Sequence, residues 1–120
     1  EEVQSIEPDY IVIEIADGLL QRETNLLLSS KKFMKTIDGV VLSCGDSLGV
    51  LGGLEWLSKL GIQPFAISGL FTISPMLVDE IRYQIRQPVL TLNQLLMINI
   101  NHMMNKELIP EPDAALFNVQ

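Results

Sequence analysis

The sequence is poor in the residues that most often carry recognisable chemistry, with one cysteine and one histidine in 120 residues. A single cysteine, Cys44, cannot form an internal disulfide, which favours an intracellular and cytoplasmic protein. The only histidine, His102, falls in the last predicted helix and gives Ser43, Cys44 and Ser47 no base for nucleophilic catalysis. No residues have the spacing of a zinc site.

Basic residues and long apolar runs are also scarce. Eight Lys and Arg stand against fifteen Asp and Glu, so the net charge is −7 and the pI is about 4.5. Such a protein repels phosphate backbones and anionic lipid, so we expect neither nucleic acid nor membrane as a partner. No apolar run approaches the ~20 residues of a membrane span, and no signal peptide is visible. The sequence begins with Glu1 rather than Met, as expected for a trimmed start or a piece of something longer.

Apolar residues, by contrast, are abundant. They make up 48% of the sequence, and the mean hydropathy is +0.29. This composition suits strands that are buried on both faces. It also indicates a further surface covered by other protein. We therefore expect a missing N-terminal half as partner, or a homo-oligomer formed through an apolar face.

Strand-like and helix-like segments alternate along the chain. Short β-branched or apolar runs at 10–16, 40–44, 65–68 and 89–91 are each followed by a helical pattern, at 18–28 with 31–36, 48–60, 75–85 and 92–106. This alternation predicts an α/β fold of three layers, with a mostly parallel sheet of about four strands and right-handed crossover helices. Residues 1–108 form a single α/β domain on this interpretation, and residues 109–120, with two prolines, form a C-terminal tail.

Glu14 stands out because it interrupts the most apolar predicted strand, 10–16. A carboxylate there costs several kcal/mol unless it is paired, hydrogen-bonded or bound to a metal. One interpretation is an acid at the strand end that holds Mg²⁺. The other is a structural pair with Arg22, Lys31 or Lys32, or simple access to water.

Ligands of such sheets bind beyond the carboxyl ends of the strands, where further polar residues are predicted. Asp17 either caps the helix that follows it or adds a second acid to the crevice. The turn with Asp46 and Ser47 offers backbone N–H groups to an anion, or it is an ordinary capped strand-to-helix turn whose Gly52-Gly53 lets the helix approach the sheet. It matches neither G-x-G-x-x-G nor G-x-x-x-x-G-K-[ST]. Phe71, on the loop 69–73, is a candidate to stack on a ligand.

Taken together, these segments resemble a known family. VIEIADG at 12–18 resembles the Walker B strand of the dethiobiotin-synthetase-like branch of P-loop nucleotide-binding proteins. The stretch 38–70 is similar to the next strand–helix–strand unit of that branch, including uncharacterised bacterial members. The resemblance covers residues 9–91.

The resemblance implies a nucleotide-binding role with Mg²⁺ and ATP as cofactors of the intact protein. Glu14 falls at the family's Mg²⁺-associated acid, and Asp17, Gly18, Asp46, Ser47 and Gly69 fall along the nucleotide crevice. Ser68-Gly69 replaces the base-reading Asn, and the phosphate loop with its lysine is missing, because the family has it upstream. The chain thus looks like a C-terminal portion that binds no cofactor alone. The alternatives are a non-catalytic α/β module acting through protein–protein contacts and a small-molecule-binding domain closed by Phe71.

Overall fold

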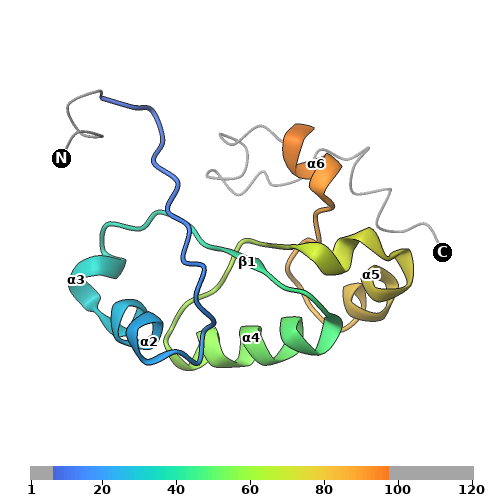
Figure 1. Ribbon diagram of the computed structural model, residues 1–120, viewed down its shortest axis with the longest axis horizontal. Helices are drawn as coiled ribbons and strands as arrows, with labels where there is room; N and C mark the ends of the chain where they lie inside the picture. The colour runs from blue at the N-terminus through green and yellow to red at the C-terminus, as the bar shows by residue number, and fades with distance from the viewer. Residues whose placement is uncertain (1–6, 98–120) are drawn as a thin grey trace.

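The structure is a computed structural model that describes residues 7–97 and shows a mixed α/β chain (Figure 1). His102, the predicted tail and the second half of the last predicted helix lie outside these residues. The elements in chain order are α2 (Arg22–Ser29), α3 (Lys31–Met34), β1 (Val41–Ser43), α4 (Ser47–Lys59), β2 (Ala66–Ser68), the 3₁₀ turn η1 (Leu70–Ile73), α5 (Pro75–Arg82) and α6 (Leu92–Met97).

A small parallel sheet joins the middle of the chain. β1 pairs with β2 in parallel, with Val41 opposite Ala66 and Ser43 opposite Ser68. A parallel bridge between Ile67 and Val89 extends the sheet on the other side of β2. The predicted strands at 40–44 and 65–68 are therefore confirmed. The one predicted at 89–91 is reduced to this bridge.

The predicted strand 10–16 is not formed, and this corrects the expectation from its apolar pattern. Within residues 7–97 the structure has two strands and a bridge rather than four strands in three layers. Tyr10–Ala16 is assigned to no helix or strand, and the Val12 side chain is 84% exposed. The physical reason is that an apolar alternation selects extended backbone, whereas a strand also needs a neighbouring edge to bond with.

The helix ends follow local signals in the sequence. The Asp46 carboxylate accepts from Gly49 N at 2.6 Å and caps α4. Ser74 caps α5, and Pro75 occupies its first position. Gly61 lies just beyond the end of α4 with φ +76°, and its N–H donates to Ser58 O, as is typical of a glycine that follows a helix. These signals explain why the helices that flank β2 begin and end where they do.

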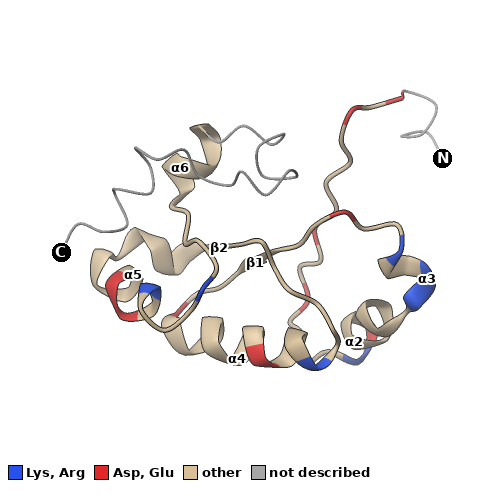
Figure 2. Cartoon of the chain, turned by 180° about the vertical axis from the view of Figure 1, so that it is seen from behind, with Lys and Arg blue, Asp and Glu red and all other residues tan. Residues whose placement is uncertain are grey.

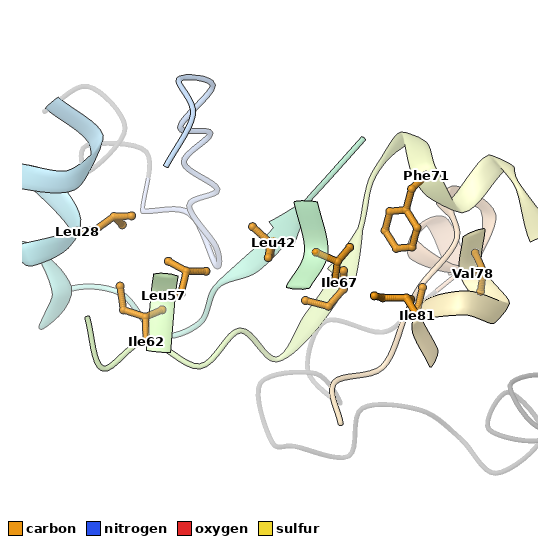
Figure 3. Packing of buried hydrophobic residues seen from close by; sticks show 10 residues of the cluster. Leu28, Leu42, Leu57, Ile62, Ile67, Phe71, Val78 and Ile81 are labelled. Carbon is orange, nitrogen blue, oxygen red and sulfur yellow. The ribbon is translucent and has the colours of Figure 1, made fainter. Parts of the chain in front are cut away.

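The core is formed by side chains from α2, β1, α4, β2, η1 and α5 (Figure 3). A Cβ on Gly53 would lie 2.9 Å from Leu42 Cδ2, so the missing side chain lets α4 approach β1, as predicted for this glycine pair. Gly52 has open space instead. The core cluster consists of Leu28, Leu42, Val50, Leu57, Ile62, Ile67, Phe71, Val78, Ile81 and Val89. No helix in the described part of the chain is long and apolar enough to cross a bilayer.

Candidate functional site at the carboxyl ends of the strands

The carboxyl ends of β1 and β2 are tied together by backbone hydrogen bonds. Cys44 N donates to Ser68 O at 3.0 Å, and Phe71 N donates to Cys44 O at 3.3 Å. The Ser68 hydroxyl donates to Leu90 O at 2.6 Å and connects the third segment, after the Val89 bridge. Residues that follow β1, β2 and the bridge at Val89 therefore meet at this end of the sheet.

Gly69 makes this convergence possible because its backbone passes directly against that of Cys44. Its φ is +114°, a backbone conformation that residues other than glycine rarely adopt. A Cβ at this position would collide with Cys44 N and O and would lie 2.8 Å from Ser43 Oγ. Gly69 is buried, so its role in the structure is to bring the two turns together.

Asp46 and Ser47 lie on the rim of this end, at the start of α4. The Ser47 hydroxyl donates to Glu80 Oε2 at 2.8 Å in an exposed position, which links α4 to α5. The presence of Glu80 at this rim could not be predicted from the sequence, because this contact depends on how the two helices pack. Two carboxylates on the rim favour a cation over a phosphate group. Among residues 7–97, no three His, Cys, Asp or Glu side chains are grouped closely enough to hold a metal ion by themselves.

Cys44 directly follows β1, two residues before Asp46 of this rim. Burial raises the pKa of its thiol to about 11, and the negative charge of Asp46 adds to this effect. The thiol is therefore protonated at neutral pH and is a poor nucleophile.

Glu14, Asp17 and Gly18 lie elsewhere. Their segment lies at the end of the molecule where α2 and α3 are, away from α5 (Figures 1 and 2). Glu14 and Asp17 are both exposed. The structure thus brings Asp46, Ser47 and Gly69 together but does not place Glu14, Asp17 and Gly18 with them.

Asp17 does not cap the helix that follows it, in contrast to one of its two predicted roles. The residue before α2 is Gln21, whose side chain makes no capping hydrogen bond, because the turn 18–21 delays the start of the helix. Asp17 contributes its carbonyl oxygen instead, which accepts from Thr24 Oγ1 at 3.5 Å. Its carboxylate stays in solvent.

Phe71 cannot stack on a ligand, because it is 1% exposed and belongs to the core. The turn η1 directs Phe71 inward, whereas its neighbour Leu70 is 70% exposed. The prediction that Phe71 closes over a ligand is wrong. An aromatic residue on a predicted loop carries no sign of which way a short 3₁₀ turn will direct it.

A cavity of about 290 Å³ lies at the opposite end of the sheet. The connections 34–40 and 60–63, which lead into β1 and β2, line it. Small-molecule sites usually have volumes of about 300–1,000 Å³ and several convergent polar groups. Asp38 is the one acidic residue that lines this cavity. The cavity was not predicted from the sequence.

Comparison of the chain with protein-family models, with curated proteins and with solved structures finds no match.

Proposed function

We propose that this chain is the C-terminal portion of a P-loop-type nucleotide-binding domain whose phosphate loop lies in an upstream part of the protein. One observation carries the proposal. Tyr10–Ala16 has the composition of a buried strand and the acid Glu14 within it, yet it forms no strand and its large apolar side chains are 38–84% exposed. A segment of this kind is expected where the rest of a sheet is supplied from elsewhere.

In the intact domain, Tyr10–Ala16 is a strand of a parallel sheet with at least four strands and helices on both faces. Glu14 then acts as the Walker-B-like acid that holds Mg²⁺, directly or through water. Asp46, Ser47 and Gly69 line the nucleotide crevice, and Asp17 and Gly18 join them when the segment 10–18 is incorporated into the complete sheet. Such a protein works in the cytoplasm, where ATP and Mg²⁺ are available.

The described residues supply groups for the metal ion of a metal–nucleotide complex but not for its phosphates. The rim carries Asp46 and Glu80, which suit a cation, and it lacks a lysine that would meet a triphosphate. Mg²⁺ usually binds through one or two carboxylates together with substrate phosphates, so no complete protein cage is needed. The phosphate ligand must then be held by residues from upstream.

The test is Mg-ATP binding by titration calorimetry, with the natural full-length protein and with residues 1–120. We expect binding by the full-length protein and no micromolar affinity in residues 1–120. Glu14→Gln should weaken Mg-ATP binding at least tenfold, whereas Glu55→Gln, an exposed acid on α4, should leave it unchanged. Equal binding by the Glu14→Gln protein, or a natural chain without an upstream phosphate loop, would overturn the proposal.

A second candidate is a non-catalytic module that acts through protein–protein contacts. It is favoured by large apolar side chains exposed on elements that pack together at one end, with Leu48 on α4 at 78%, Leu70 on η1 at 70% and Met76 on α5 at 67%. This candidate predicts concentration-dependent association in analytical ultracentrifugation, weakened by Leu70→Ser. A full-length protein that stays monomeric at high concentration contradicts it.

A further inference from the structure

We infer that this chain binds a second copy of itself end to end, with the α4–η1–α5 end of one copy docked on the α2–α3 end of the next. The inference rests on the second candidate of the proposed function, a module that acts through protein–protein contacts, and it names the partner. The two ends lie apart in one copy, because α4 runs between them and its 13 residues span about 20 Å (Figure 1). One chain therefore cannot cover one of its ends with the other.

The first end carries an exposed apolar ridge. Ile73 of η1 is 68% exposed, and it lies three residues after Leu70 and three before Met76, which are exposed as well. Side chains three residues apart in a 3₁₀ turn lie on the same side, so Leu70 and Ile73 face solvent together while Phe71 is buried. Leu48, at the start of α4, extends the ridge where α4 and α5 pack together.

Acidic side chains border this ridge. Asp46 caps α4 directly before Ser47, and the Ser47 hydroxyl donates to Glu80 of α5. The carboxylates of Asp46 and Glu80 are therefore held on either side of the start of α4. Both residues are exposed. The ridge thus has an acidic border that is fixed in place by hydrogen bonds.

Basic residues do not offset this border. From residue 36 to residue 81 the one basic residue is Lys59, which lies in the last turn of α4, at the other end of that helix. Arg82, in the last turn of α5, lies beside Asp79, with 3.6 Å between its Nε and Asp79 Oδ1, so these two charges offset each other. A partner for the ridge must therefore bring apolar side chains together with basic ones, because like charges across an interface repel.

The α2–α3 end has this chemistry. Leu20 and Leu26 are 78% and 62% exposed there. Residues 18–37 contain Glu23 as their only acid. α2 and α3 contact each other, and the basic side chains on and beside them are all exposed (Figure 2): Arg22, Lys31, Lys32 and Lys35. The segment with Glu14 and Asp17 lies at the same end, so the basic surface is confined to α2 and α3.

Each end therefore supplies the charge that the other end lacks, and both expose apolar side chains. A contact between two different surfaces of identical chains is heterologous, so it leaves one free end of each kind and can add further copies. Charge complementarity of this kind steers association and selects the orientation of the partner. The second copy is thus the occupant that the described residues favour.

Two variants of the natural full-length protein test the orientation, each with one end disabled. The first is Leu70→Ser with Ile73→Ser, and the second is Lys31→Glu with Lys32→Glu. All four side chains are exposed, so both variants should unfold at the same urea concentration as the parent. We expect the parent to associate as its concentration rises in sedimentation velocity. Each variant alone should associate at least tenfold more weakly, whereas Glu55→Lys, a charge reversal within α4, should behave like the parent.

A mixture of the two variants gives the decisive result. The intact basic end of the first can still dock on the intact acidic end of the second, but neither can add a third copy. We expect 1:1 dimers and no larger species. A mixture that stays monomeric would overturn the inference, and so would undiminished association of the lysine variant alone, which would indicate contact between two identical ends.

The same experiment separates this inference from the candidate function on which it rests. A parent protein that associates equally well with both ends disabled would refute the end-to-end contact alone. A full-length parent that stays monomeric, while residues 1–120 associate, would mean that the upstream part covers the ridge, and it would also overturn the inference. A parent that is monomeric in both forms would refute the inference and the protein–protein candidate together.

Discussion

Two regions of this molecule have nearly the same apolar character and opposite fates. In the body formed by residues 41–73, which include β1, α4, β2 and η1, Val50 and Ile67 are completely buried. In the segment Tyr10–Ala16, Val12 and Ile13 are 84% and 56% exposed. Side-chain hydrophobicity does not distinguish them. What distinguishes them is that β1 and β2 pair with each other, whereas residues 10–16 form no strand of the described sheet.

The comparison teaches that burial in a parallel sheet follows from pairing. An isolated apolar strand gains little from collapse onto a surface, because its peptide groups would lose water without a hydrogen-bond partner. β2 meets this requirement on both sides, with β1 on one edge and the Val89 bridge on the other. All three of its residues are buried as a result.

The largest contrast is expected from truncating one apolar side chain in each region. Phe71→Ala, in the body, should lower the free energy of unfolding by about 3–5 kcal/mol, because it removes a fully buried ring and leaves a cavity. Val12→Ala should change it by less than about 0.5 kcal/mol, as for exposed substitutions in general. Urea denaturation of residues 1–120 measures both. A Val12→Ala cost close to that of Phe71→Ala would break the comparison.

A second contrast concerns backbone packing at Gly69. Gly69→Ala should cost about 2–3 kcal/mol, because the new Cβ meets the Cys44 backbone and the positive φ is strained. Gly52→Ala is the matched control, since open space surrounds that position and alanine favours a helix interior. We expect Gly52→Ala to stabilise the protein by about 0.5–1 kcal/mol in the same denaturation experiment. Equal effects of the two substitutions would show that the turns do not need their close approach.

Local signals account for the part of the fold that was predictable from sequence. Ser74-Pro75 marks the start of α5, and Gly61 marks the end of α4, because caps depend on a few neighbouring residues. The prediction of a strand at Tyr10–Ala16 was wrong because strand pairing depends on two segments. Nothing within one segment reveals whether the second is present.

The same distinction holds for the candidate site. The convergence of the turns around Asp46, Ser47 and Gly69 followed from parallel topology, and the structure has it. The Ser47–Glu80 hydrogen bond did not follow from the topology, because it arises from the packing of α5 on α4. Phe71 was misplaced for a related reason: the direction of a side chain in η1 is set by the core beneath it.

Helix capping extends the comparison to α4, the long helix of the body, and α2, the helix that follows the segment. α4 is capped by Asp46, whereas α2, which follows the exposed segment, begins at Gln21 without a side-chain cap. Asp46→Ala should cost about 1 kcal/mol, because Gly49 N loses its acceptor. Gln21→Asp should instead add up to about 1 kcal/mol by supplying the missing cap. Denaturation curves test both, and stabilisation by Asp46→Ala would contradict the assigned cap.

The smallest expected effect at neutral pH concerns the thiol of the body. Cys44 ionises near pH 11 when folded, so below its unfolded pKa of about 8.5 the thiol is neutral in both states and its contribution to stability is complete.

As the pH rises from about 9 to 11, the unfolded chain loses this proton first, so stability should fall more steeply than in a Cys44→Ser variant. Alkylation by iodoacetamide at pH 8 should be slow at Cys44 and at least tenfold faster at Val12→Cys in the Cys44→Ser background, because the segment is exposed. Equal alkylation rates at the two positions would mean that the body and the segment expose their side chains alike. The difference in burial between the two regions would then be wrong.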